Sequence, residues 1–531
     1  MSPDHMRMVC GILQKHLLPD VRAWVFGSRA KWTATDASDL DLALEGDGKI
    51  GYETMDALEC AFEESDLPYK VDVVDLHRVN HSFRHIIEAQ MTTLPILKNT
   101  SNNTNGQPMI ALGDVADLRM SGVDKKIKNH EQSVLLCNYT DVYNNNFIHS
   151  GMDFMMATAT EHEISKYALT KGDVIITIDS EKYNDIGVPA LVRENIRGLI
   201  CGYHLAILRP TPKIDGTYLY YVLETSNAAL QFQLYANGIT RFGLRRSDIE
   251  RVEIPLLSLN EQRTAARILS ALDDKIELNR RMNQTLEGMA RALFKSWFVG
   301  FDPVRAKMDG RWSPGESLPG LPAHLYDLFP DSLVDSELGE IPERWSAGIL
   351  DDYFNLTMGR SPPSDTCNDE GRGLPFFQGS ADFGLRYPRN RKYCTAPARV
   401  AHADDTLVSV KAPVGAMNMA WDECCAGRGV AALRHKTGSR SFTYYLVWSL
   451  RHDLKQYEQV GTMSGSITKK QLETLPIVEP PTRLVGCFEA CVSAWDERIR
   501  LNTSESRLLM LQRDALLPKL VSGEFRPCPA G

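Results

Sequence analysis

The sequence predicts an α/β multidomain protein that contains an N-terminal α/β domain, two further α/β domains, and two long helices that form an antiparallel coiled coil. Three observations carry this prediction. The first hundred residues combine short apolar strands with spaced carboxylates, most of the remaining chain repeats its own motifs, and a long helical stripe follows each copy. A chain of 531 residues is too long for one hydrophobic core, so several domains are expected.

Changes in composition and periodicity place the boundaries. A polar run without apolar periodicity starts at Asn99 and marks a linker. The expected parts are an N-terminal domain at 1–98, a linker at 99–108, a first α/β domain at 109–258, a first helix at 259–299, a spacer at 300–346, a second α/β domain at 347–480 and a second helix at 481–525.

The N-terminal domain shows a pattern suited to nucleotide chemistry. A buried strand runs into the turn Gly27-Ser28, and Asp39 and Asp41 follow on an alternating strand, where they share one face. A later strand adds Asp72. Carboxylates on one face beside a Gly-Ser turn suit a divalent metal that bridges nucleotide phosphates.

Over about residues 8–97 this pattern resembles the minimal nucleotidyltransferase domains of the polymerase-beta superfamily. The resemblance implies that Gly27 and Ser28 contact phosphates and that Asp39, Asp41 and Asp72 hold Mg²⁺, as the catalytic set of an active domain. An idle copy kept for docking is the alternative that the sequence leaves open.

The internal repeat runs in the same order in both copies, about 230 residues apart. Each copy ends in a helix whose apolar residues recur at threes and fours, which is typical of a seam for a partner helix. A small domain cannot cover so long a stripe, so pairing of the two helices is favoured over packing of each helix on its own domain. The corresponding segments are 112–118 with 350–356, 172–177 with 404–409, 202–209 with 427–434, 220–221 with 444–445, 239–244 with 467–472, and 273–279 with 496–502.

The order of domain, helix, domain and helix, over about residues 107–525, is similar to the DNA-specificity subunits of type I restriction–modification systems. Local phrases at 259–262, 293–299, 301–304, 339–342 and 516–523 carry this resemblance, whereas the N-terminal domain departs from the usual architecture. The resemblance implies a non-catalytic subunit whose two target-recognition domains each bind one half of a split, asymmetric site in double-stranded DNA. The helices would hold the two domains at a distance that places the half-sites ~12–16 bp apart, at ~3.4 Å per base-pair step of DNA.

The same resemblance implies partners. The helices would dock two adenine methyltransferase subunits, and motor–nuclease subunits would join them. The chain has neither a methyltransferase motif nor a Walker A loop, so S-adenosylmethionine and ATP are expected on the partners, with no cofactor in the specificity part. The rival hypothesis is a Mg²⁺-dependent nucleotidyltransferase that modifies a protein or RNA, with the DNA-reading part used for targeting.

Candidate DNA contacts follow from charge and hydrogen-bonding capacity. The repeated turns suit phosphate contacts, although a structural turn shared by duplication explains them as well. The basic, aromatic-interleaved run after 385 suits phosphates or base edges, with a solvated loop as the alternative, and dissimilar loops such as 137–139, 144–146 and 378–380 would read bases. The candidates are Thr240, Arg241, Thr468, Lys469, Lys470, Arg386, Arg389, Arg391 and Lys392, and more weakly Lys125 and Lys126.

Composition narrows the remaining options. The net charge of −9 neither supports nor excludes DNA binding, because local patches decide it. The 11 cysteines lack metal-ligand spacing, no apolar run is long enough to span a membrane, and the N-terminus lacks a signal-peptide pattern. We therefore expect a cytoplasmic protein with reduced thiols and no membrane partner.

Overall fold

The computed structural model describes residues 3–17, 21–27, 39–46, 48–79, 84, 87, 92–93, 108–182, 184–238, 240–458 and 465–526. The chain divides into two compact units, one formed by residues 1–274 with 509–531 and the other by residues 275–508. The long helices α10 (Leu259–Phe298) and α16 (Thr482–Val521) contribute to both units. Among the described helices, none is long and apolar enough to cross a membrane.

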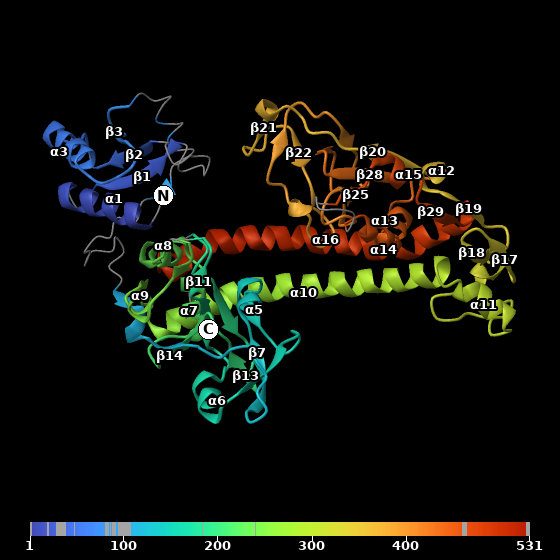
Figure 1. The fold of residues 1–531 in the computed structure, drawn as a ribbon, viewed down its shortest axis with the longest axis horizontal. Helices are drawn as coiled ribbons and strands as arrows, with labels where there is room; N and C mark the ends of the chain where they lie inside the picture. The colour runs from blue at the N-terminus through green and yellow to red at the C-terminus, as the bar shows by residue number, and fades with distance from the viewer. Residues whose placement is uncertain are drawn as a thin grey trace. The chain divides into compact units, whose positions relative to one another are not determined.

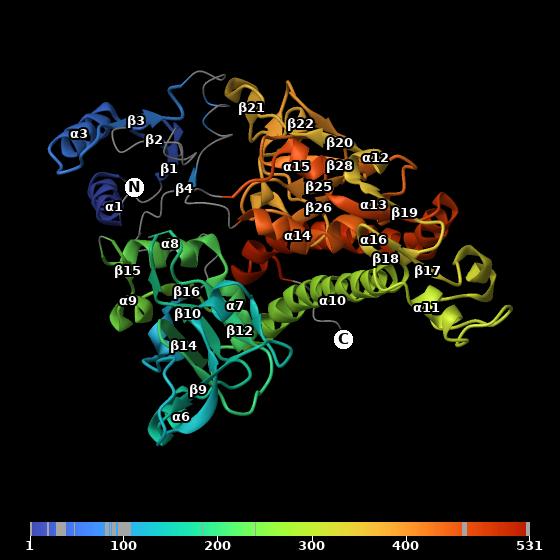
Figure 2. The same cartoon turned by 45° about the vertical axis from the view of Figure 1, so that its right-hand side comes forward.

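The N-terminal domain is an α/β fold on a four-stranded sheet of order β3-β2-β1-β4 (Figure 2). Its elements are α1 (Pro3–His16), β1 (Arg22–Phe26), β2 (Leu40–Glu45), α3 (Tyr52–Glu63), β3 (Val71–Asp75) and β4 (Thr92–Thr93). Alternation in β2 buries Leu40, Leu42 and Leu44 in the core. Strand β2 runs parallel to β3, and their register places Asp41 directly opposite Asp72.

The first α/β domain, called repeat 1 (109–258), contains a five-stranded sheet of order β6-β14-β10-β12-β8 and a three-stranded sheet of order β13-β7-β9. Helix α7 packs on the larger sheet and buries Tyr218, Tyr220 and Tyr221. The elements are β5 (Met109–Ala111), η1 (Leu112–Asp114), β6 (Ala116–Met120), β7 (Gln132–Cys137), α5 (Tyr139–Tyr143), β8 (Phe147–Ile148), β9 (Met155–Ala159), α6 (Glu161–Tyr167), β10 (Val174–Thr177), β11 (Asp179–Ser180), β12 (Pro189–Val192), β13 (Leu199–Cys201), β14 (Leu205–Pro210), α7 (Gly216–Leu223), α8 (Ser226–Tyr235), β15 (Phe242–Gly243), α9 (Arg246–Glu250) and β16 (Glu253–Pro255).

The second α/β domain, called repeat 2 (347–480), contains a four-stranded sheet of order β20-β28-β25-β26 and a five-stranded sheet of order β21-β23-β22-β27-β24. Its elements are β19 (Ser346–Ile349), α12 (Leu350–Tyr353), β20 (Phe354–Met358), η3 (Ser364–Thr366), β21 (Cys367–Asn368), β22 (Leu374–Phe377), η4 (Ser380–Asp382), β23 (Tyr393–Cys394), β24 (Val400–Ala401), β25 (Thr406–Ser409), β26 (Met417–Met419), β27 (Cys424–Ala426), β28 (Val430–His435), α13 (Arg440–Ser449), α14 (Arg451–Lys455), η5 (Gln456–Glu458), α15 (Lys469–Glu473) and β29 (Pro476–Glu479). The preceding spacer holds α11 (Asp302–Met308), η2 (Ala323–Leu328), β17 (Leu333–Ser336) and β18 (Gly339–Pro342).

The two repeats share their topology, which confirms the duplication. Strands β6, β14, β10 and β12 occur in the same order as β20, β28, β25 and β26. In each repeat, a tyrosine hydroxyl also forms a hydrogen bond with the long helix that follows. The Tyr221 hydroxyl donates to Asp273 of α10 at 2.6 Å, and the Tyr445 hydroxyl donates to Asp496 of α16 at 3.4 Å. These two contacts are called the tyrosine–aspartate anchors.

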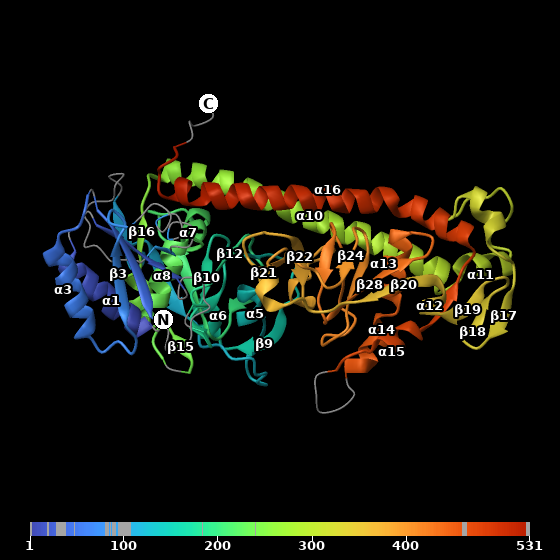
Figure 3. The same ribbon diagram turned by 90° about the horizontal axis from the view of Figure 1, so that it is seen from above.

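The two long helices form an antiparallel coiled coil, and Figures 1 and 3 show them side by side. In the second unit, Asn502 Nδ2 donates to Asn283 Oδ1 at 2.9 Å, and both side chains are buried. In the first unit, Asp273 pairs with Arg513 at 2.9 Å. Residues earlier in α10 therefore contact residues later in α16, as in an antiparallel pair. Each helix has 40 residues, equivalent to ~60 Å at 1.5 Å per residue.

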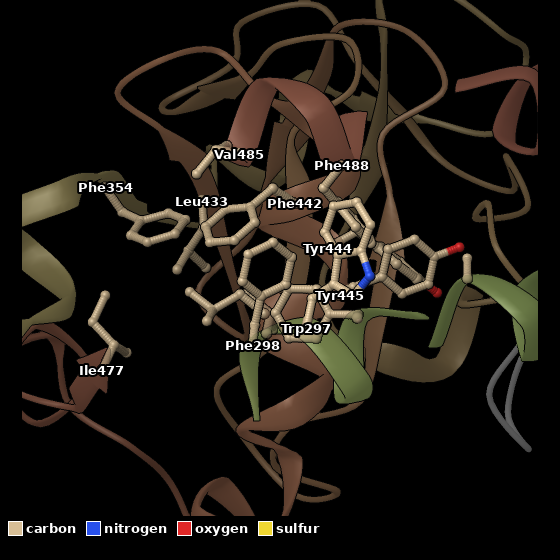
Figure 4. Packing of buried hydrophobic residues seen from close by; sticks show 14 of the residues in the cluster. Trp297, Phe298, Phe354, Leu433, Phe442, Tyr444, Tyr445, Ile477, Val485 and Phe488 are labelled. Carbon is tan, nitrogen blue, oxygen red and sulfur yellow. The ribbon is translucent and has the colours of Figure 1, made fainter. Parts of the chain in front are cut away.

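Aromatic packing holds the end of α10 in the second unit. Phe298 lies 5.2 Å from Phe442 of α13 and 5.3 Å from Phe488 of α16 between ring centroids, and Trp297 is fully buried beside them (Figure 4). Such edge-to-face contacts add to the stabilisation from buried apolar area. The end of α10 therefore packs on repeat 2 and on α16, whereas Ala265 and Leu269 near its start pack in the core of repeat 1, the domain that α10 follows.

Candidate functional sites

The turn after β1 requires glycine at position 27. Gly27 has φ +73°, and a Cβ atom there would lie 2.2 Å from Asp41 Oδ2. Only a residue without a side chain allows this backbone to approach the carboxylate so closely. The predicted phosphate contact Ser28 lies outside the described residues.

Two of the predicted carboxylates, Asp41 and Asp72, lie opposite each other on the β2–β3 strand pair. Burial raises the pKa of Asp41, and the negative charges of Asp72 and Asp39 raise it further. Lys70 Nζ lies 2.5 Å from Asp72 Oδ1, in a mostly exposed ion pair. Asp41, Asp72 and Lys70 border a cavity of ≈ 790 Å³, which is large enough for a nucleotide-sized ligand.

The chemistry of this donor set fits a divalent cation, because carboxylate oxygens are hard ligands and a cation would relieve the repulsion around Asp41. Within the described ranges, however, no group of three or more carboxylates, imidazoles or thiols is placed to hold a metal ion. Metal binding by Asp39, Asp41 and Asp72 therefore stays a prediction, and Asp72 would have to exchange its contact with Lys70 for one with the metal.

The repeated turns differ in what their side chains contact. Thr240 and Arg241 are exposed, and Arg241 Nη2 lies 3.0 Å from the His204 ring, which in turn pairs with Asp179. Thr468 is the N-cap of α15 and accepts a hydrogen bond from the Gln471 backbone nitrogen at 3.3 Å. Capping accounts for this hydroxyl, so the structural alternative explains Thr468.

The remaining lysines of the turns and loops are accessible. Lys469 pairs with Glu473 at 2.9 Å on the exposed face of α15, and Lys470 beside it is also exposed. Lys125 and Lys126 lie on an exposed loop between β6 and β7. These positions leave their cations available to a phosphate backbone.

The basic run of repeat 2 is divided between interior and surface. Arg386 was predicted to contact DNA, and this prediction is wrong, because its side chain is only 1% exposed and pairs with Glu287 and Asp496. Arg389, Arg391 and Lys392 are exposed. Arg391 lies 3.6 Å from Asp382, whereas Lys392 borders a cavity of ≈ 490 Å³.

Sequence reasoning missed one cation at this cavity, Arg428. It borders the cavity with Lys392 and with Gln378 from one of the predicted reading loops. A lone arginine between two glycines carries no local signal. The alignment of segment 202–209 with segment 427–434 could have singled it out, because it places Arg428 opposite Tyr203.

Comparison with known proteins gives two family matches. A family model described as the type I restriction modification DNA specificity domain matches residues 106–288, and one described as polymerase beta, nucleotidyltransferase, matches residues 12–95. A putative type I restriction enzyme MjaX specificity subunit from Methanocaldococcus jannaschii is 30% identical over 377 residues, covering 69% of this chain and 81% of that protein.

Two proteins of Haemophilus influenzae match different parts of the chain. The type I restriction enzyme HindI specificity subunit is 26% identical over 454 residues, covering 75% of this chain and 95% of that protein. The probable protein adenylyltransferase MntA is 43% identical over 84 residues, covering 16% of this chain and 73% of that protein. Given its duplicated domains, its paired helices and these relatives, the chain belongs to the type I restriction enzyme specificity subunits and carries an N-terminal domain of the polymerase-beta nucleotidyltransferase family.

Proposed function

We propose that the protein acts in the cytoplasm and binds a bipartite, asymmetric site in double-stranded DNA, with one half read by repeat 1 and the other by repeat 2. The duplication carries this proposal. Both repeats keep one topology and one tyrosine–aspartate anchor, yet they expose different side chains around equivalent turns. Shared exposed cations such as Arg241 and Lys469 suit phosphates, and the dissimilar side chains suit base edges.

The helix pair is proposed as the docking surface for two adenine methyltransferase subunits, which bind S-adenosylmethionine, with motor–nuclease subunits that use ATP joining the complex. Leu278 and Leu501 occupy equivalent positions of the duplication and are 48% and 54% exposed. Exposed leucines on a paired helix suit an apolar partner surface. Because the leucine is duplicated, two equivalent surfaces are available for two copies of one partner.

A map of methylated adenines tests the DNA-binding proposal. The chain is expressed with its cognate methyltransferase in cells that otherwise lack adenine methylation. We expect one split motif whose two halves differ in sequence. Purified Arg241→Ala and Lys469→Ala proteins should bind DNA more weakly on every sequence and show a salt slope smaller by about 1 each. A motif without a gap would contradict the two-part site, and unchanged salt slopes would remove both residues from the interface.

Native mass spectrometry tests the docking proposal. Wild type should hold two methyltransferase copies, Leu278→Asp and Leu501→Asp should each hold one, and the double variant none. Val334→Asp in the spacer, at a residue that is 41% exposed, is the matched control and should keep both copies. Two bound copies in the double variant would place the docking surface elsewhere.

A second function is proposed for the N-terminal domain, namely Mg²⁺-dependent transfer of a nucleotide to a protein or RNA. The close approach of Gly27 to Asp41, together with the in-register Asp72, favours it. Asp39, Asp41 and Asp72 would hold Mg²⁺, which would supply charge neutralisation for the phosphates.

Labelled nucleotide incubated with the full chain, Mg²⁺ and host protein or RNA fractions tests this second function. Transfer should disappear in Asp41→Asn and persist in Asp56→Asn, which changes an exposed aspartate of α3. Absence of label in every fraction with the wild-type chain would leave the domain with a structural role.

A further inference from the structure

The turn between β13 and β14 and the turn between β27 and β28 are one structural element used twice. The Gly202 nitrogen donates to the Cys137 carbonyl at 2.8 Å, and the Gly427 nitrogen donates to the Phe377 carbonyl at 2.9 Å. A Cβ atom at Gly202 would lie 2.8 Å from Cys137 O, and one at Gly427 would lie 2.9 Å from Gln378 Cα. Close backbone packing therefore fixes both turns at the same place in the fold.

The residue after this glycine is the point at which the two turns differ in chemistry. Repeat 1 places Tyr203 there, 52% exposed, and repeat 2 places the exposed Arg428. The next position holds His204 in repeat 1 and Gly429 in repeat 2, where a Cβ atom would lie 2.3 Å from Gln378 O. One rigid position with two different exposed side chains is what a duplicated protein needs to distinguish two half-sites.

The surroundings of Arg428 are those of a binding site. It borders the cavity of ≈ 490 Å³ together with Lys392 and Gln378, and Phe376 forms an apolar part of the wall. Among the described residues, neither Arg428 nor Lys392 has an ion-pair partner. The Ser361 hydroxyl also borders the cavity, and its oxygen is buried without a hydrogen-bond partner from the described part of the chain.

We propose that Arg428 determines the sequence specificity of the half-site bound by repeat 2, by donating two hydrogen bonds to O6 and N7 of one guanine in the major groove. A guanidinium only donates hydrogen bonds, and guanine is the base that presents two adjacent acceptors there. Lys392 contacts a neighbouring phosphate, and Tyr203 takes the equivalent place against the other half-site. This assignment rests on the proposed DNA-binding function.

Base preference at every position of both half-sites is the measurement that tests the assignment. The whole methyltransferase complex is used with duplexes that carry each single base-pair change. Arg428→Ala should reduce discrimination at one G·C pair of the second half-site by about 5- to 150-fold and leave the first half-site unchanged. Tyr203→Ala should change only the first half-site, so each variant is the control for the other.

Two further variants separate specificity from charge and folding. Arg428→Lys keeps a cation but loses the planar fork, so it should lose the guanine preference and keep the salt dependence. Arg311→Ala removes an exposed arginine from the spacer and should alter neither half-site.

Uniformly weaker binding in Arg428→Ala, with every base preference retained, would mean a phosphate contact and would overturn the assignment. A wild-type complex without a split motif would overturn the proposed function itself, and the assignment with it. A wild-type split motif that stays intact in Arg428→Ala would refute the assignment alone.

Discussion

Replacing Arg386 with alanine should destabilise the second compact unit, because two buried carboxylates would lose their shared cation. Arg386 Nη1 lies 3.2 Å from Glu287 Oε1, and Nη2 lies 2.9 Å from Asp496 Oδ1. The guanidinium carbon also lies 3.5 Å from the ring centroid of Tyr444. Burial acts to lower the pKa of Arg386, but the charges around it, that of Asp496 foremost, raise it well above its ordinary value.

The expected loss follows from these contacts. Removing one partner of a buried ion pair costs about 3–5 kcal/mol. Glu287 keeps a second cation, Arg291 at 2.8 Å, and Asp496 keeps a hydrogen bond from Ser441 at 2.5 Å. The lower part of the range, about 3–4 kcal/mol, is therefore expected. In a unit of this size each kcal/mol lowers Tm by about 2–4 °C, so the fall should be roughly 6–16 °C.

Calorimetry of the full chain, with hydrogen exchange of the α13 amides, would measure the effect in the right unit. Arg389→Ala is the matched control, because Arg389 is an exposed arginine three residues away and its loss should stay within about 0.5 kcal/mol. Combining Arg386→Met with Asp496→Asn should recover part of the loss, since the neutral pair no longer buries an uncompensated charge.

One result would refute this reasoning. If Arg386→Ala weakened DNA binding while Tm and α13 exchange stayed at wild-type values, the guanidinium would face DNA rather than the interior. Equal destabilisation by the single variant and by the combination with Asp496→Asn would likewise deny that the two charges compensate each other.

Three other changes probe separate parts of the chain. Asn502→Leu leaves Asn283 Oδ1 without its donor, so the free energy of unfolding, measured by chemical denaturation, should fall by about 1–3 kcal/mol. The double variant with leucine at positions 283 and 502 should lose less, because no buried polar group is left unpaired. A larger loss in the double variant would contradict the buried hydrogen bond. Gly27→Ala forces a Cβ atom against Asp41 at a backbone φ of +73°, so it should destabilise the N-terminal domain by about 1 kcal/mol or more. The loss should appear as faster proteolysis of residues 1–98. A wild-type rate of proteolysis would show that the turn tolerates the added atom. Burial raises the pKa of Glu224 from 4.5 to about 7, so the stability that this group contributes to the first unit is fully present below pH 4.5 and should fall by on the order of 1–2 kcal/mol, after solvent screening, as the pH rises through 7. Thermal unfolding of Glu224→Gln between pH 5 and 8 should lack this component, and an unchanged pH slope would exclude Glu224 as its source.

The duplicated architecture could be predicted because its motifs are local and occur twice. Tyr220-Tyr221 and Tyr444-Tyr445 lie on buried helices, and the segments around Asp273 and Asp496 lie on the long helices. The predicted helix at 259–299 is observed as Leu259–Phe298, because its start signal and apolar period agree.

The site residues were predicted less well, since their environments depend on distant parts of the chain. Arg386 sits in a basic run that is typical of a surface, but its acidic partners are 99 and 110 residues away and only the fold brings them to it. Thr468 has the right chemistry for a phosphate contact, yet the same hydroxyl satisfies a helix N-terminus. Arg428 has no flanking cations, so charge patterning could not reveal it.

The tyrosine–aspartate anchors take their cations from different sources, and this restricts how such genes can recombine. Asp273 is neutralised by Arg513 of α16, whereas Asp496 is neutralised by Arg386, which belongs to repeat 2 itself. A chimera with repeat 1 in the place of repeat 2 would bury Glu287 and Asp496 without Arg386. The opposite chimera would bring a second guanidinium to a site that already has one. New specificities should therefore arise by exchange between like positions of different proteins, and not by shuffling the two halves within one.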